Sequence, residues 1–149
     1  MPSIVTWAKF KDRQSGQDFI HLNTHFDHRG DVARVRSAQL ILDKLAILSD
    51  DLPVVVTGDF NITPDTDAYA TMTSGLDDTK FKSESLPHGP DGTFGGFTVE
   101  LGESTDRIDY VFVGAGVKVL RYGVVSDQWN GVYPSDHLPV LAEIKMLSR

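Results

Sequence analysis

The sequence contains no cysteine, which excludes disulfide bonds and metal sites built on thiolates. Basic residues are few: 14 lysines and arginines stand against 21 acidic residues, so the formal net charge is -7. A broad nucleic-acid-binding surface usually shows as a basic excess. The charge therefore argues against tight, nonspecific DNA binding, but it leaves open a phosphate ester as a bound substrate.

Long apolar runs are also missing, since no stretch approaches the roughly 20 apolar residues of a membrane span. The N-terminus enters a strand pattern at Ile4 without a basic region and an apolar region, so no signal peptide is visible and the compartment stays open. Internal repeats and low-complexity tracts are absent. With 149 residues, 40% of them apolar, the chain is long enough for one domain, 1–149, with a buried core.

The stretch 52–61 organises the chain. Three consecutive valines after Pro53 predict a short strand that is buried on both faces. Asp59 and Asn61 follow where this strand opens into a loop, and side chains two residues apart on an extended backbone point to the same side. A carboxylate and an amide at the carboxyl end of a strand lie where α/β sheets bind ligands.

Periodicity predicts the remaining elements. A helix over 31–48, with Asp31 as its N-cap, separates the strand 19–25 from the strand 53–58, which is the order of a crossover unit. On the strand 19–25, His21, Asn23 and His25 share one face. Further strands are expected at 4–11, 107–113, 117–125 and 139–146, a short helix at 64–73 with Thr63 as N-cap, and a long irregular connection at 74–106.

Polar residues gather at four strand ends, in segments 23–25, 58–61, 107–110 and 135–137. Each has an ordinary alternative: Asp59 as a turn residue, Asp109 as the ion-pair partner of Arg107 or Arg121, and His137 as a structural histidine. Together, aspartate, asparagine and histidine at several strand ends fit metal-assisted hydrolysis of a phosphate ester. A histidine held by a carboxylate supplies acid/base chemistry, and amide and imidazole donors hold phosphate oxygens.

These segments, in this order, resemble the endonuclease/exonuclease/phosphatase superfamily, the DNase I-like fold. The matching segments are Asn23–His28, Gly58–Asn61, Arg107–Tyr110 and Ser135–His137, and Gly92–Phe97 resembles a motif of a bacterial subgroup of uncharacterised hydrolases. The resemblance spans the whole chain. It implies an α+β fold, a DNase I-like α/β sandwich, of which this chain is about one half: a mixed sheet with a crossover helix on one face.

The resemblance also implies roles for individual residues. His137 is the catalytic histidine beside the scissile phosphate, and Asp109 orients it. Asp59 positions or deprotonates the nucleophilic water. Asn61 and His25 contact the phosphate. The second histidine of the 23–28 segment, His28, is a further phosphate-binding candidate, and Asp136 contributes to the metal site. His21 and His88 match nothing in the family pattern and are interpreted as surface or structural residues.

One departure is large. Family members begin with a strand carrying an asparagine and a second strand ending in a glutamate that is the principal Mg²⁺ ligand, and neither segment is found here. The glutamates of this chain lie in other settings, at positions Glu84, Glu100, Glu103 and Glu143. The chain therefore resembles the C-terminal portion of the family domain. We expect weak binding of Mg²⁺ (or Mn²⁺) and little activity from this chain alone.

Two functional interpretations follow. The first is a Mg²⁺-dependent phosphoesterase that cleaves a phosphodiester or a phosphomonoester; the alternative is a non-catalytic ligand-binding or interaction module of the same fold. Nucleic acid, lipid head group and sugar phosphate substrates all occur in the superfamily, and the acidic charge favours a small substrate. Half of a two-sheet sandwich would leave an apolar sheet face open, so a homodimer through that face, or a separate N-terminal half, is the expected partner. The alternative is that the connection 74–106 folds over this face.

Overall fold

The computed structural model describes residues 3–97 and 106–147. The elements, in chain order, are β1 (Val5–Lys11), β2 (Asp18–His25), α1 (Asp31–Leu48), β3 (Val54–Asp59), α2 (Asp67–Thr73), β4 (Asp77–Asp78), α3 (Thr79–Lys82), β5 (Asp109–Val113), β6 (Val117–Val124) and β7 (Val140–Met146). Within these residues, no helix is both long and apolar enough to cross a bilayer.

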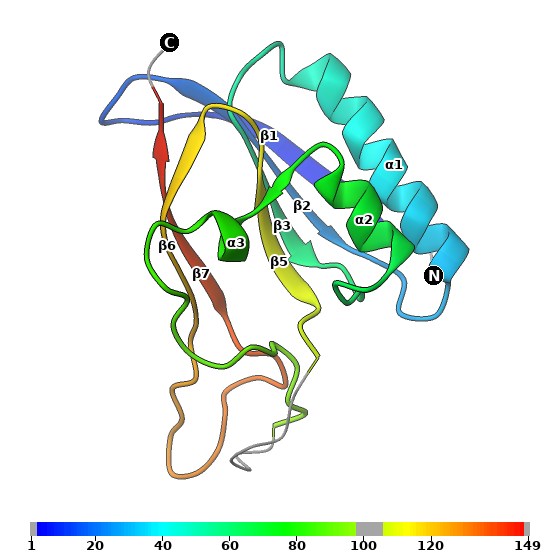
Figure 1. Cartoon of the computed structure of the whole chain (residues 1–149), viewed down its shortest axis with the longest axis vertical. Helices are drawn as coiled ribbons and strands as arrows, with labels where there is room; N and C mark the ends of the chain where they lie inside the picture. The colour runs from blue at the N-terminus through cyan, green and yellow to red at the C-terminus, as the bar shows by residue number, and fades with distance from the viewer. Residues whose placement is uncertain (1–2, 98–105, 148–149) are drawn as a thin grey trace.

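A mixed five-stranded sheet forms the centre of the molecule, in the order β1-β2-β3-β5-β4. The strands β2 and β3 are parallel, and every other neighbouring pair in this sheet is antiparallel. The helix α1 connects β2 to β3, so the predicted crossover unit is confirmed. The α+β fold is likewise the one expected. The helices α1 and α2 lie on one side of the sheet, whereas the antiparallel pair β6-β7 lies on the other (Figure 1).

The central strand β3 is apolar on both faces because each face meets a different layer. Val54 and Val56 pack in the main core with the helices α1 and α2, in which Phe60 and Phe112 are fully buried. Val55 points the other way, into a second cluster with residues of β5, β6 and β7. Alternation of side chains along a strand thus divides three consecutive valines between two cores.

Alternation along β2 also follows the sequence pattern. Ile20, Leu22 and Thr24 are buried toward the helices. His21 and Asn23 lie on the opposite face, where both side chains hydrogen-bond to Oγ1 of Thr57, each at 2.9 Å. This face, which we call the inner face, carries apolar residues at one end of the sheet and polar residues at the other.

The inner face is only partly covered by β6 and β7. A cleft of about 740 Å³ remains between the two sheets, bordered on one side by Phe19 and His21 and on the other by Ile144 and Met146. Phe10 of the edge strand β1 stacks on Phe19 at the rim of this cleft and is 47% exposed. The inner face is therefore covered by β6 and β7 over one part and accessible at this cleft.

The helix α1 covers the predicted residues 31–48, but its N-cap differs from the prediction, and so does the start of α2. The N-cap of α1 is Gly30, and Asp31 is the first helical residue, placed where a negative charge favours the helix dipole. The helix α2 begins at Asp67, because the backbone N–H of Thr66 donates to the Thr63 carbonyl and closes a turn first. The Thr66 hydroxyl then accepts from the N–H of Tyr69 and caps the helix. The prediction of a helix from Pro64 was wrong because two threonine caps competed.

The connection 74–106 is not wholly irregular, and residues 98–105 of it lie outside the described part of the chain. It contains β4 and α3, which a buried ion pair fixes: Nη2 of Arg107 lies 2.7 Å from Oδ2 of Asp78, with both side chains almost fully buried. Tyr69 donates its hydroxyl to the same carboxylate, and the guanidinium stacks over the ring of Tyr110. Neither partner of this pair can be identified from apolar periodicity.

Candidate active site

The register of three strands brings polar side chains into one row at an edge of the sheet. His25 is paired with Asp59 across β2 and β3, and Asp59 is paired with Asp109 across β3 and β5. Paired residues in neighbouring strands point to the same face. The row therefore lies on the inner face, at the carboxyl ends of β2 and β3.

A tight turn joins Asp59 to Asn61. Asn61 has a left-handed backbone (φ 50°), which asparagine adopts more readily than most residues. Its backbone N–H donates to Oδ1 of Asp59 at 2.9 Å, and its side-chain amide donates to the Phe26 carbonyl at 3.0 Å and to Oδ2 of Asp59 at 3.3 Å. The two side chains therefore meet through a turn, and not through the extended backbone expected from the sequence.

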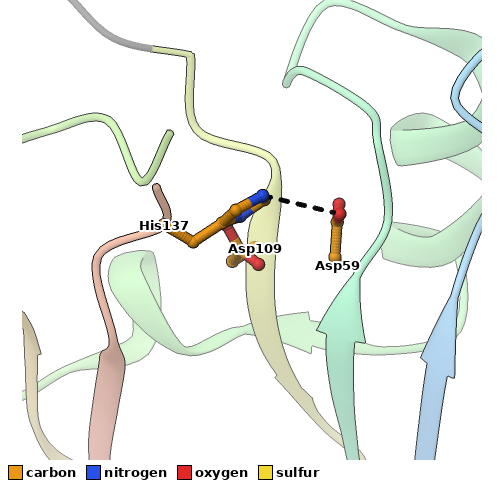
Figure 2. A group of neighbouring side chains, drawn as sticks. All are labelled: Asp59, Asp109 and His137. Carbon is orange, nitrogen blue, oxygen red and sulfur yellow. Dashed lines mark hydrogen bonds and ion pairs between the residues drawn. The ribbon is translucent and has the colours of Figure 1, made fainter. Parts of the chain in front are cut away.

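His137 reaches this row from the segment that precedes β7. Its Nδ1 donates to Oδ2 of Asp109 at 2.8 Å, and its Nε2 lies 4.0 Å from Oδ2 of Asp59 (Figure 2). The predicted hydrogen bond between His137 and Asp109 is thus present. A carboxylate that accepts from Nδ1–H fixes the ring orientation and leaves Nε2 facing the second carboxylate.

The close packing of these groups shifts their pKa values. Burial lowers the pKa of His137, but the hydrogen bond and charge of Asp109, together with Asp59 and Asp136, outweigh it and place that pKa above the ordinary value. Burial raises the pKa of Asp59, and the charge of Asp109 acts in the same direction, although the N–H of Asn61 opposes both. Both shifts favour a proton held between the histidine and the carboxylates.

The shift at His137 predicts a pH dependence of stability. Because its pKa is higher in the folded state, His137 stabilises the fold fully below its ordinary pKa of 6.5, and this contribution is lost as the pH rises through the folded pKa. The free energy of unfolding should therefore fall more steeply in the wild type than in His137→Gln as the pH rises above 6.5. Urea denaturation over a series of pH values above 6.5 measures both slopes, and equal slopes in the two proteins would contradict the prediction.

The other predicted residues lie at different distances from this centre. His25 is adjacent, with its Nε2 3.6 Å from Oδ2 of Asp59. His28 contacts its sequence neighbours instead: Nε of Arg29 donates to Nε2 of His28, whose Nδ1 lies 3.9 Å from Asp27. The Asp136 side chain accepts from the Ser135 hydroxyl at 3.4 Å, in the segment before His137. The structure therefore brings His25 into the row and leaves the exposed side chain of His28 in contact with its sequence neighbours.

The sequence did not predict that Phe94 contacts His137 in this site. The Phe94 ring lies 5.0 Å from the imidazole of His137 in an edge arrangement, and the two residues form an isolated backbone bridge. The motif Gly92–Phe97 marks this segment in the sequence, but no pattern indicates that it reaches His137.

The side chains of Asp59, Asp109 and His137 offer some, but not all, of the ligand atoms that a hard cation needs. One ligand atom each of Asp59, Asp109 and His137 lies within 4.8 Å of the others, which is close enough for a shared metal ion. Oδ2 of Asp109 already accepts from His137, so few free carboxylate oxygens face the centre. Mg²⁺ prefers oxygen ligands and often takes several from substrate or water. These residues therefore fit an ion that is held jointly with a phosphate.

A family model, Endonuclease/Exonuclease/phosphatase family, matches residues 2–137, which include every residue of this site. The chain belongs to the endonuclease/exonuclease/phosphatase family. No curated protein matches the chain. The family model extends through the site segments described above and ends at His137.

Several solved structures are similar to this chain in fold. A mannosyl-6-phosphatase from Bacteroides thetaiotaomicron is 34% identical with a TM-score of 0.91, over 98% of this chain and 58% of that one. A family protein from Bacteroides vulgatus is 39% identical with a TM-score of 0.89, over 97% of this chain and 56% of that one. The human Nocturnin catalytic domain, 22% identical with a TM-score of 0.73 over 97% of this chain and 53% of that one, shares the fold. The present chain therefore spans little more than half the length of each of these proteins.

Proposed function

We propose that this family chain forms part of a metal-dependent phosphoesterase, in which domain 1–149 corresponds to the C-terminal portion of the family domain. The observation that carries the proposal is the His137–Asp109 pair facing Asp59 across 4.0 Å at a sheet edge. The membership of the family supports a phosphoester hydrolase, and the name of the Bacteroides thetaiotaomicron relative, a phosphatase, agrees with it.

Asp59 is the residue that positions the attacking water and accepts its proton. Its raised pKa suits this role, because a general base is most effective when its pKa approaches the working pH. The turn at Asn61 holds Oδ1 of Asp59 through a backbone N–H, so the second oxygen faces the centre. A water bound to that oxygen would lie beside the imidazole of His137.

His137 is the residue that stabilises the developing charge on the phosphate and protonates the leaving oxygen. Asp109 keeps the proton on Nδ1 and supports the charged imidazolium, which is the protonation state favoured by the raised pKa of His137. A charged donor aimed at the reacting phosphate acts most strongly where water is largely excluded. The His137 side chain is 29% exposed, so it is partly shielded and still accessible to a ligand.

Asn61 and His25 are the phosphate-binding residues of this proposal, and His28 is a further candidate. The amide nitrogen of Asn61 lies 3.0 Å from the Phe26 carbonyl, 3.3 Å from Oδ2 of Asp59 and 3.4 Å from Nδ1 of His25. It would exchange one of the two longer contacts for a phosphate oxygen. The His25 side chain is 71% exposed beside Asp59, which leaves room for a phosphate oxygen at its Nε2. His28 would reach the phosphate only by leaving its contacts with Asp27 and Arg29.

The proposed cofactor is Mg²⁺ or Mn²⁺, which would supply charge neutralisation for the phosphate. Asp136 is the ligand proposed from the family resemblance, and oxygens of the phosphate would complete the coordination. Because few carboxylate oxygens of the site are free, we expect binding weaker than micromolar without phosphate. Isothermal titration calorimetry checks this; micromolar Mg²⁺ affinity abolished by Asp136→Ala would contradict it.

The substrate class proposed is a small phosphate ester, in keeping with the formal net charge of -7, which disfavours a long polyanion. The test is hydrolysis of bis-p-nitrophenyl phosphate and p-nitrophenyl phosphate with Mg²⁺ or Mn²⁺ at high protein concentration. Slow, metal-dependent release of nitrophenol that is lost in His137→Ala is expected. Release that is unchanged in His137→Ala would contradict the proposal.

The alternative is a non-catalytic binding module of the same fold. The two functions separate when phosphate binding and turnover are measured on the same sample. A module would bind inorganic phosphate at His25 and His137, visible in nuclear magnetic resonance spectra, without metal-dependent turnover of either ester.

The open inner face leads to the proposed assembly, a homodimer, with a separate N-terminal half as the other partner. Phe10 and the cleft beside Phe19 supply apolar surface that a second copy could cover. Analytical ultracentrifugation at tens of micromolar is expected to give the mass of two chains. A monodisperse single chain would contradict the homodimer.

A further inference from the structure

The segment 93–96 lies between the two parts of the chain that supply Asp109 and His137. Toward β5, the backbone N–H groups of Thr93 and Phe94 both donate to the Asp106 carbonyl, at 3.0 and 3.1 Å. Toward β7, the N–H groups of Gly95 and Gly96 donate to the Asp136 carbonyl, at 2.9 and 3.2 Å. The segment therefore bonds on one side to a residue three positions before Asp109 and on the other to the residue that precedes His137.

Thr93 is the central residue of this segment, and its side chain is fully buried. The Thr93 hydroxyl accepts from two successive backbone N–H groups, those of Ile108 at 3.0 Å and Asp109 at 3.1 Å. The Thr93 carbonyl accepts from the N–H of Leu138 at 2.6 Å. One residue thus fixes the backbone of Asp109 through its side chain and the residue after His137 through its main chain.

The aromatic neighbour of Thr93 contacts the imidazole directly. The Phe94 ring lies 5.0 Å from the His137 ring at an interplanar angle of 63°. Edge contacts of this kind restrict ring rotation, since each ring occupies space that the other would sweep. The backbone and side chain of two adjacent residues therefore act on the same His137–Asp109 pair.

We propose that Thr93 is a positioning residue for this pair, an inference that rests on the proposed hydrolytic function of the site. Asp109 and His137 are 28 residues apart, and no ladder of strand hydrogen bonds joins their segments within the described residues. The 2.8 Å bond between their side chains depends on the backbone being held on both sides. The segment 93–96 holds Asp109 through the hydrogen bond from the Asp109 N–H to the Thr93 hydroxyl. Because this acceptor belongs to a side chain, a substitution can remove it and leave the backbone unchanged.

The experiment compares Thr93→Val with Thr93→Ser. Valine has nearly the shape of threonine but accepts no hydrogen bond, so two buried N–H groups lose their acceptor, whereas serine keeps it. Thr79→Val is the matched control. Thr79 is also fully buried, and its hydroxyl donates to the Val111 carbonyl of the same strand β5, away from Asp109.

The first measurement is the nitrogen-15 spectrum of the His137 ring at alkaline pH, assigned by its loss in His137→Gln. In the wild type, Thr93→Ser and Thr79→Val, the neutral ring should carry its proton on Nδ1, where Asp109 accepts it. In Thr93→Val, the ring should shift to a mixture of tautomers. A wild-type tautomer in Thr93→Val overturns the proposal, and if that variant does not fold, loss of the Nδ1 proton in Thr93→Ser overturns it.

The second measurement separates this inference from the proposed function. Where hydrolysis is detected, Thr93→Val should lower kcat by at least tenfold with little change in KM, and Thr93→Ser should restore it. A tautomer shift without hydrolysis in any variant would leave Thr93 as a positioning residue and remove the hydrolytic function. Hydrolysis that continues unchanged in Thr93→Val, with an unchanged ring, would remove the positioning role alone.

Discussion

Replacing His137 by glutamine is expected to reduce the rate of phosphodiester hydrolysis by about 10²- to 10⁴-fold, the range that positioned acid/base groups contribute. Glutamine retains a polar side chain but cannot carry the positive charge that Asp109 supports in His137. The loss should appear in kcat, because the histidine acts on the developing charge rather than on the bound ester. Steady-state hydrolysis of bis-p-nitrophenyl phosphate with Mn²⁺ measures it.

The control for this substitution is His88→Gln, which changes the same residue type outside the row. The backbone of His88 bonds to β6 through the Tyr122 carbonyl and the Val124 N–H, and glutamine preserves these bonds. Its rate should equal that of the wild type within about twofold, since surface substitutions usually change little. An equal loss in both variants would point to impaired folding and would contradict a specific role of His137.

Replacing Gly58 by alanine is expected to lower the free energy of unfolding by more than about 4 kcal/mol, an exceptional value for one methyl group. Gly58 has φ +154° and is paired with Thr24 across the parallel strands β2 and β3. A Cβ atom there would lie 2.0 Å from the Thr24 carbonyl oxygen and 2.9 Å from its carbon. Backbone atoms between two central strands cannot move aside, so the strands themselves must separate.

Urea denaturation followed by circular dichroism tests the size of this effect, with Gly16→Ala as its control. Gly16, in the turn between β1 and β2, also has a positive φ of +74°, but no atom lies within 4 Å of a Cβ placed there. Its replacement should therefore cost only the backbone strain, about 1 kcal/mol. Equal losses in the two variants would mean that strain, and not the clash with Thr24, decides the stability at Gly58.

Much of the fold could be predicted because its signals are local. The helical spacing of apolar residues over 31–48 and the three valines of β3 identify a crossover unit, and alternation along β2 separates Ile20 and Leu22 from His21 and Asn23. The buried side of a helix or strand requires apolar residues at a fixed spacing, so the sequence pattern and the structure agree. The site residues came from short motifs and their order, which identify a family without giving any distance.

Other features depended on competition between alternatives that look alike in the sequence. Thr63 and Thr66 are both suitable helix caps, and the turn that the Thr66 N–H closes decides between them. Asn61 reaches Asp59 through a left-handed turn, where an extended backbone would also have brought the two side chains together. Differences between such local conformations are small, and contacts with distant residues select one of them.

The sequence by itself determined the apolar periods, the absence of thiol chemistry and the family motifs that contain Asp59, Asp109 and His137. The tertiary structure alone decided which of these groups touch: the strand register that aligns Asp59 with Asp109, and the bond from His137 to Asp109. It also decided that Thr93 holds the backbone of Asp109. Periodicity records which side of an element is buried, whereas register and long-range hydrogen bonds depend on the packing of the whole chain.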